Sequence, residues 1–92
     1  MSNSDEIYIL CKVPNKKGLH ARAAAQIVSV SSGFDSELTI THKNKTVISL
    51  SLVKLLTLDA PQGSSLEIRA TGPQAEIAAD AIREIIENGF GE

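Results

Sequence analysis

Apolar and polar residues alternate along several short segments of the chain, and this pattern predicts strands. Residues 7–13 are apolar and β-branched, and a Pro-Asn pair interrupts the pattern after them. Residues 36–42 and 65–71 alternate between polar and apolar side chains, and residues 45–49 continue from the first of these after a Lys-Asn turn. The pattern therefore predicts four strands, of which the second and third form a β-hairpin.

Three other segments repeat their apolar residues at helical spacing. Residues 21–32 have an apolar face, and Gly33 stands where a left-handed residue commonly ends a helix. Residues 52–58 predict a helix of only two turns. Residues 74–88 predict the clearest helix, which we expect Gly89 to end. The apolar stripe of this last helix consists of Ala75, Ala78, Ala79, Ile82, Ile85 and Ile86.

The predicted order of elements is β-α-β-β-α-β-α, which defines an α+β fold. Each strand has one apolar and one more polar face, so three helices should cover a single face of a four-stranded, mainly antiparallel sheet. The result is an open-faced two-layer β-sandwich. No linker, repeat or low-complexity stretch divides residues 1–92, so we expect one domain. A chain of 92 residues has little room for an internal cavity, and its chemistry should lie on the surface.

The composition excludes several classes of protein. The single Cys11 cannot form an internal disulfide, and no Cys/His cluster has metal-ligand spacing. The first six residues are polar and acidic, unlike a signal peptide, and no apolar run is long enough for membrane insertion. A net charge of -2 argues against nucleic-acid binding. These features predict a cytoplasmic protein that binds neither nucleic acid nor a metal.

The charges are segregated along the chain. Residues 7–33 contain four basic residues and no acidic one, whereas residues 74–92 contain five acidic residues and one arginine. The basic end is suited to an anion. From charge alone, however, two ordinary solvated faces are the favoured interpretation.

The segment from Gly18 to Arg22 lies at the junction of a loop with the first predicted helix. The first N–H groups of a helix have no intrahelical partner, so those of Ala21 and Arg22 can bind an anion together with the positive end of the helix dipole. His20 immediately precedes them. A phosphoryl group carried on His20 could therefore accept hydrogen bonds from this helix end.

Histidine suits this position because its neutral ring is a nucleophile. The helix end disfavours the imidazolium ion, so we expect a neutral His20 at about pH 7. Arg22 can approach the phosphoryl oxygens, on which charge spreads during transfer. Without a nucleotide-binding motif or cofactor, the phosphoryl group must come from a partner. The alternative for His20 is an exposed histidine with no function, and we assign no role to His42.

The residues from Gly18 to Ala25 resemble the active-site signature of HPr, the histidine-containing phosphocarrier of the bacterial phosphotransferase system. Residues 51–58, followed by Gln62 and Gly63, resemble the second signature of this family, around its regulatory serine. The order of predicted elements agrees as well. The resemblance covers about residues 6–88.

The resemblance implies that enzyme I phosphorylates His20 on Nδ1, with phosphoenolpyruvate as the ultimate donor, and that an EIIA-type domain receives the group. It implies that Arg22 assists, that the protein is a monomer, and that no cofactor takes part. It also implies a docking surface on the first and second helices. The second helix would contribute Leu52, Val53, Leu56 and Thr57 to this surface, although about half of the leucines in residues 52–58 should be buried.

Ser51 corresponds to the serine that an HPr kinase/phosphorylase modifies in some members of the family. A phosphate there would stabilise the second helix and place negative charge on the docking surface. The alternative is a plain N-cap, a role that Ser49 could also fill. The two interpretations of Ser51 have about equal weight.

Two departures from the family pattern bear on the function. Ala23 replaces the usual proline, which restores a backbone N–H without loss of helix propensity. Ser29 and Ser32 stand where many members have lysines, so the attraction to an acidic partner should be weaker. A nitrogen-related regulatory branch is therefore an alternative to sugar uptake.

Two further hypotheses come from other classes of protein. One is a regulatory binding module of the same fold that acts through Ser51 and needs no chemistry at His20. The other is a small-ligand sensor, which is disfavoured because no polar cluster suggests a pocket. The complete His-x-Arg pair favours the phosphocarrier over both.

Overall fold

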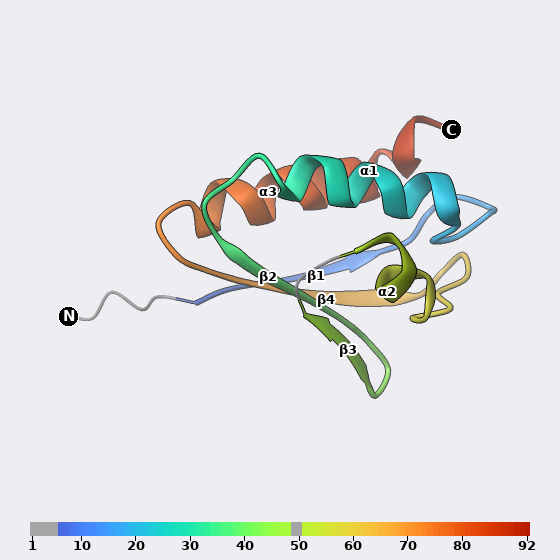
Figure 1. The fold of residues 1–92 in the computed structure, drawn as a ribbon. Coiled ribbons are helices and arrows are strands. Elements are labelled where there is room, and N and C mark those ends of the chain that lie inside the picture. Colours follow the sequence, from blue (N-terminus) through green and yellow to red (C-terminus); the bar gives the residue numbers. More distant parts are fainter. Residues whose placement is uncertain (1–5, 49–50) are drawn as a thin grey trace.

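The computed structural model describes residues 6–48 and 51–92, and in these residues the elements follow the predicted order (Figure 1). The sheet has the strand order β1-β4-β2-β3, and every neighbouring pair is antiparallel. The predicted α+β open-faced sandwich is confirmed. None of the helices described is long and apolar enough to cross a membrane. The elements are β1 (Ile7–Lys12), α1 (Ala21–Ser31), β2 (Glu37–His42), β3 (Lys45–Ile48), α2 (Leu52–Leu56), β4 (Ser65–Thr71), α3 (Ala75–Glu87) and the 3-10 turn η1 (Gly89–Gly91).

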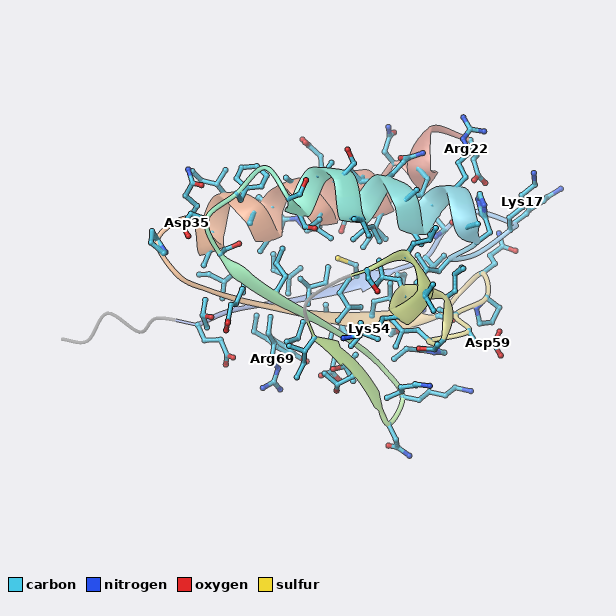
Figure 2. All side chains as sticks on the ribbon, viewed as in Figure 1. Lys17, Arg22, Asp35, Lys54, Asp59 and Arg69 are labelled. Atoms are coloured by element: carbon cyan, nitrogen blue, oxygen red, sulfur yellow. The ribbon has the colours of Figure 1, made fainter. Side chains whose placement is uncertain are left out.

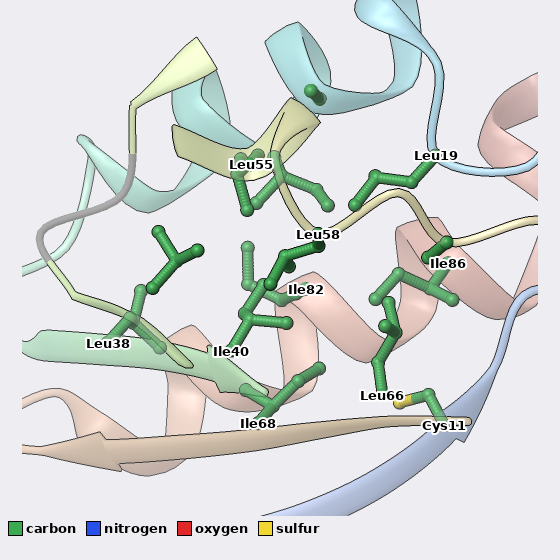
Figure 3. Packing of buried hydrophobic residues seen from close by; sticks show 14 of the residues in the cluster. Cys11, Leu19, Leu38, Ile40, Leu55, Leu58, Leu66, Ile68, Ile82 and Ile86 are labelled. Atoms are coloured by element: carbon green, nitrogen blue, oxygen red, sulfur yellow. The ribbon is translucent and has the colours of Figure 1, made fainter. Parts of the chain in front are cut away.

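The helices cover one face of the sheet. α1 and α3 lie side by side over the strands, and α2 packs beneath the N-terminal half of α1 (Figure 1). Ile68 of the central strand β4 is fully buried and lies opposite Ile40 of β2. Figure 3 shows both side chains among buried residues from the sheet, α2 and α3. Alternation along the strands thus places one apolar side chain in every two against the helices.

The other face of the sheet is open. Tyr8 and Leu10 of the edge strand β1 are 52% and 59% exposed on this face. The guanidinium carbon of Arg69, opposite Tyr8 in the neighbouring strand, lies 5.2 Å from the centre of the tyrosine ring. A cation over an aromatic face is a favourable contact at an exposed site.

The end of α1 differs from the prediction. The helix ends at Ser31, and Ser32 is a right-handed C-cap whose N–H donates to Val28 O. Gly33 does not adopt the expected left-handed conformation. The chain instead leaves the helix through tighter turns, because Gly33 N–H donates to Val30 O at 3.1 Å. These bonds satisfy the last carbonyls of the helix without a positive φ.

α2 is shorter than predicted. It ends at Leu56, and Asp59 takes a left-handed conformation with a φ of 49°, which turns the chain away from the helix axis. Ser51 is its N-cap, as one of the two interpretations proposed, and its Oγ accepts a hydrogen bond from Lys54 N at 3.2 Å. The alternative cap, Ser49, and the predicted end of the third strand lie outside the described residues.

α3 confirms the clearest of the sequence predictions. It spans Ala75–Glu87, its predicted stripe is buried except for a half-buried Ile85, and Gly89 is left-handed with a φ of 65°. Gln74 is the N-cap of α3, and Pro73 precedes this cap. The following turn η1 was not predicted.

Two isoleucines on α3 provide a matched test of this packing. Ile82 is fully buried, whereas Ile77 is 56% exposed. We expect Ile82→Ala to lower the free energy of unfolding by about 2 to 5 kcal/mol, because the substitution leaves a cavity beneath the helix. Ile77→Ala should change it by no more than about 0.5 kcal/mol. Urea denaturation of both variants measures the difference, and equal losses would contradict the assignment of the core face.

Candidate functional site

A close approach between two loops positions the start of α1. The N–H of Leu19 donates to Ala60 O at 2.8 Å. Gly18 has a φ of 66°, and a Cβ atom built on it would lie 2.5 Å from Ala60 O and 2.8 Å from Pro61 Cα. The position therefore requires glycine both for its left-handed conformation and for its lack of a side chain. Gly18 thus allows the chain to turn tightly before His20.

Asn15 fixes the same loop from within. Its side chain is buried, and its Nδ2 donates to Gly18 O at 2.9 Å. Gly18 N–H donates in turn to Asn15 O at 3.1 Å. The loop thus forms a closed turn stabilised from both of its ends, and the residue after Leu19 is held in a defined position.

His20 is the N-cap residue of α1. Its backbone is extended, with φ and ψ of -85° and -179°, and its carbonyl accepts the hydrogen bond of Ala24 N at 2.9 Å. Its side chain does not cap the helix and is 24% exposed. Within residues 6–48 and 51–92, no hydrogen bond is described for the backbone N–H groups of Ala21 and Arg22. The predicted pair of free donors therefore lies next to a partly exposed imidazole.

Two basic side chains lie at the same end of the molecule. Figure 2 shows Arg22 at the start of α1 and Lys17 in the preceding loop, both extending away from the ribbon. Arg22 is exposed and forms no ion pair with the described residues. Ala23, in the position of the usual family proline, is fully buried. Because Arg22 is exposed and makes no ion pair with the described residues, its side chain can move toward an anion bound at the helix end.

The structure adds an acidic residue that sequence reasoning missed. Oε2 of Glu92 contacts Nε2 of His20, and Oε1 of Glu92 accepts a hydrogen bond from Asn15 Nδ2 at 3.1 Å. The two carboxylate oxygens of Glu92 thus contact two side chains, Asn15 in the loop and His20 at the helix start. The basic segment that has no acid of its own receives one from the other end of the chain.

A folded tail holds Glu92 in this position. Phe90 is 2% exposed and its carbonyl accepts a hydrogen bond from Gln26 Nε2 at 3.1 Å. Gln26 is half-buried at this contact. The buried Phe90 ring and this hydrogen bond attach the turn η1 to α1. Phe90 lies only two residues before Glu92, so the end of the tail is held near the start of α1.

The predicted docking residues are exposed residues of α2 and of its C-cap, Thr57. Leu52, Val53 and Leu56 are 40%, 71% and 39% exposed, and Thr57 is exposed as well. Leu55 and Leu58 are buried, as expected for about half of the leucines in this segment. α2 packs against α1, so its exposed residues lie on the same side of the sheet as His20.

His42 makes a structural contact between two segments of the chain. Its side chain is buried, and Nδ1 donates a hydrogen bond to Leu58 O at 2.8 Å. This bond connects the end of β2 to the segment after α2. His42 therefore serves as a chemically matched control for His20.

The fold and the partly exposed histidine at a helix start can be compared with known proteins, and the comparisons identify the family. The model of the family "PTS HPr component phosphorylation site" matches residues 9–88. The chain is 39% identical to the phosphocarrier protein HPr of Xylella fastidiosa over 80 residues, which cover 87% of this chain and 90% of the relative. The chain belongs to the HPr family of the phosphotransferase system.

Other relatives and solved structures agree with this assignment. The phosphocarrier protein NPr of Escherichia coli is 37% identical over 82 residues, covering 88% of this chain and 91% of the relative. The crystal structure of HPr-C-His from Thermoanaerobacter tengcongensis superposes with a TM-score of 0.84 at 36% identity, covering 96% and 97% of the two chains. Proteins of this family are carriers rather than catalysts, and they interact with enzyme I and EIIA.

The contact between Gly18 and the opposite loop can be tested with two glycines. Both Gly18 and Gly63 have a positive φ, but no atom lies within 4 Å of a Cβ built on Gly63. Gly63→Ala should cost about 1 to 2 kcal/mol of stability from the left-handed backbone alone. Gly18→Ala should cost roughly 1 to 3 kcal/mol more, because the methyl group forces the loops apart. Thermal or urea unfolding compares them, and an equal cost would show that the loops are not in close contact.

The tail contact should give the protein a specific dependence on pH. The hydrogen bond with His20, and next the bond from Asn15, lower the pKa of Glu92 below its usual range. The folded protein then binds fewer protons than the unfolded chain between the two pKa values. The contribution to stability is complete above the ordinary carboxyl pKa and is lost as the pH falls through the lowered value. Wild type should therefore be more stable than Glu92→Gln at neutral pH, and urea denaturation should show this difference disappearing in acid.

Proposed function

We propose that His20 accepts a phosphoryl group from phosphorylated enzyme I and passes it to an EIIA-type domain. The observation that carries the proposal is the placement of a partly exposed imidazole beside the free N–H groups of Ala21 and Arg22. Donors fixed in this way stabilise an anion without rearrangement. The family relationship supports the same role.

Arg22 would assist by electrostatic stabilisation. The transferring group carries its charge on three equatorial oxygens, which a guanidinium can bind through two N–H groups at once. Arg22 is exposed and not engaged in any ion pair within the described residues. It can therefore follow the phosphoryl group as it moves between a partner and His20.

The docking surface of this proposal consists of the exposed residues of α2 next to the start of α1. Its apolar centre is formed by Leu52, Val53 and Leu56, with Thr57 at the margin. Such a centre with a basic rim from Arg22 and Lys17 suits a partner surface that is apolar in the middle and acidic around it. Ser29 and Ser32 are exposed and uncharged, so the basic rim does not extend along α1.

The sugar-uptake branch and a nitrogen-related branch both agree with this surface. The chain has 39% identity to an HPr and 37% identity to an NPr over similar lengths. Phosphorylation rates with enzyme I from each branch would distinguish the two, because the docking surface determines which partner binds faster.

Ser51 motivates a second candidate function. Its Oγ lies at the start of α2, next to the exposed leucines, and is engaged only by Lys54 N among the described residues. A phosphate added there by an HPr kinase/phosphorylase would place charge on the docking surface. Ser51→Asp should weaken partner binding if this regulatory interpretation holds, whereas unchanged affinity for enzyme I and EIIA would exclude it.

The carrier function is tested by phosphorylation with phosphoenolpyruvate and a cognate enzyme I. Wild type should gain one phosphoryl mass that is lost in acid and retained in base, as expected for a phosphohistidine. His20→Ala should gain none, and Arg22→Ala should accept the group at least about tenfold more slowly, since charged hydrogen bonds contribute about 1.5 to 3 kcal/mol. Mass spectrometry and the initial rate of transfer give these values.

The matched control is His42→Gln, which replaces the other histidine and keeps a side-chain donor for Leu58 O. It should be phosphorylated like wild type. If wild type gains no phosphoryl mass, or if His20→Ala gains as much as wild type, His20 is not the acceptor.

A further inference from the structure

The contact between Glu92 and His20 has a consequence for which ring nitrogen can react. The Nε2 atom of His20 contacts the Glu92 carboxylate, whereas Nδ1 makes no hydrogen bond with the described residues. A neutral imidazole has one nitrogen that carries a proton and one with a free lone pair. The partner of the first nitrogen determines which one is free.

An ionised carboxylate can only accept hydrogen bonds. Glu92 is ionised at neutral pH, because an ordinary glutamate carboxyl is ionised there and the hydrogen bonds of Glu92 lower the pKa of its carboxyl further. The nitrogen that faces it must therefore carry the proton. The asymmetric environment of the ring thus selects one of two tautomers that are otherwise close in energy.

We propose that Glu92 is a positioning residue that keeps the proton of neutral His20 on Nε2 and leaves the Nδ1 lone pair free to accept the phosphoryl group. This inference deepens the proposed function and rests on it. The carboxylate reaches the ring through a tail that is itself fixed, by the burial of Phe90 and by the hydrogen bond of Asn15 to Oε1. Glu92 is therefore held in place before any partner binds.

The same contact also favours the transfer step itself. Nδ1 forms a bond to phosphorus while the bond between phosphorus and the phosphorylated donor protein breaks, and the electron pair of that bond leaves with the donor. The proton on Nε2 remains, so the ring gains positive charge as the new bond forms. The Glu92 carboxylate next to Nε2 stabilises this charge, in the way that a carboxylate stabilises the imidazolium in a catalytic triad.

The position of the proton is measured directly by long-range ¹H–¹⁵N spectra of the histidine ring at about pH 9, where an ordinary imidazole is neutral. Wild type should show the proton on Nε2 of His20. Glu92→Gln, whose amide can donate as well as accept, and Glu92→Ala, which has no acceptor, should show a mixture of both tautomers. Glu84→Gln removes the same charge from an exposed position on α3 and should resemble wild type.

The rate of phosphoryl transfer is the second measurement. Glu92→Gln should accept the group about two- to fivefold more slowly than wild type, the effect expected of an exposed charge pair, while Glu84→Gln should be unchanged. A part of the product of Glu92→Gln should carry the group on Nε2, which separates from the Nδ1 product by chromatography of the hydrolysed protein.

Two results would overturn the proposal: a wild-type ring with its proton on Nδ1, or the same tautomer in wild type, Glu92→Gln and Glu92→Ala. Backbone amide spectra establish that the variants are folded. The ring spectra need no phosphoryl donor. A wild type that accepts no phosphoryl group would therefore overturn the proposed function, while the spectra would still decide the role of Glu92.

Discussion

The backbone contact of Gly18 with Ala60 and Pro61 is the constraint on which the geometry of the site depends. At this point two loops approach so closely that no side chain fits between them. Hydrogen bonds on both sides of the contact extend it, from Leu19 to Ala60 and from Gly63 to Val13. The start of α1 is thereby attached to the segment between α2 and β4. The histidine keeps its orientation because the loop before it cannot move independently of the sheet.

The second constraint acts between the start of α1 and the C-terminal tail. The start of α1 and the tail after α3 are far apart in sequence, but antiparallel β1 and β4 and the packing of α3 on the sheet bring them together. Phe90 then fixes the tail by burial, which requires no particular charge. The burial of Phe90, together with the hydrogen bond from Asn15, thus positions the carboxylate of Glu92 next to His20.

Short-range patterns of the sequence account for most of the fold. Alternation predicted the strands because one face of each is buried, and the spacing of alanine and isoleucine predicted α3 because its stripe faces the sheet. Gly33 failed as a marker because turns of right-handed conformation satisfy the same carbonyls, and glycine permits a positive φ without requiring one. The sequence could identify His20 and the helix donors, since both belong to one local junction. It carried no signal for Glu92, which lies 72 residues from His20 and meets it only through the folded tail.

Two groups of opposite electrostatic character lie at the His20 ring: the start of α1 and the Glu92 carboxylate. The helix end beside His20 offers donors to an anion, whereas the Glu92 carboxylate offers an acceptor at Nε2, and Nδ1 makes no hydrogen bond with the described residues. Neither partner binds the phosphoryl group covalently or through a metal, and the imidazole remains about one-quarter exposed. A phosphoryl group carried there, as we propose, would be stabilised by a few donors at an open surface. Such stabilisation suits a carrier, because a group that is held too strongly cannot be passed to the next protein.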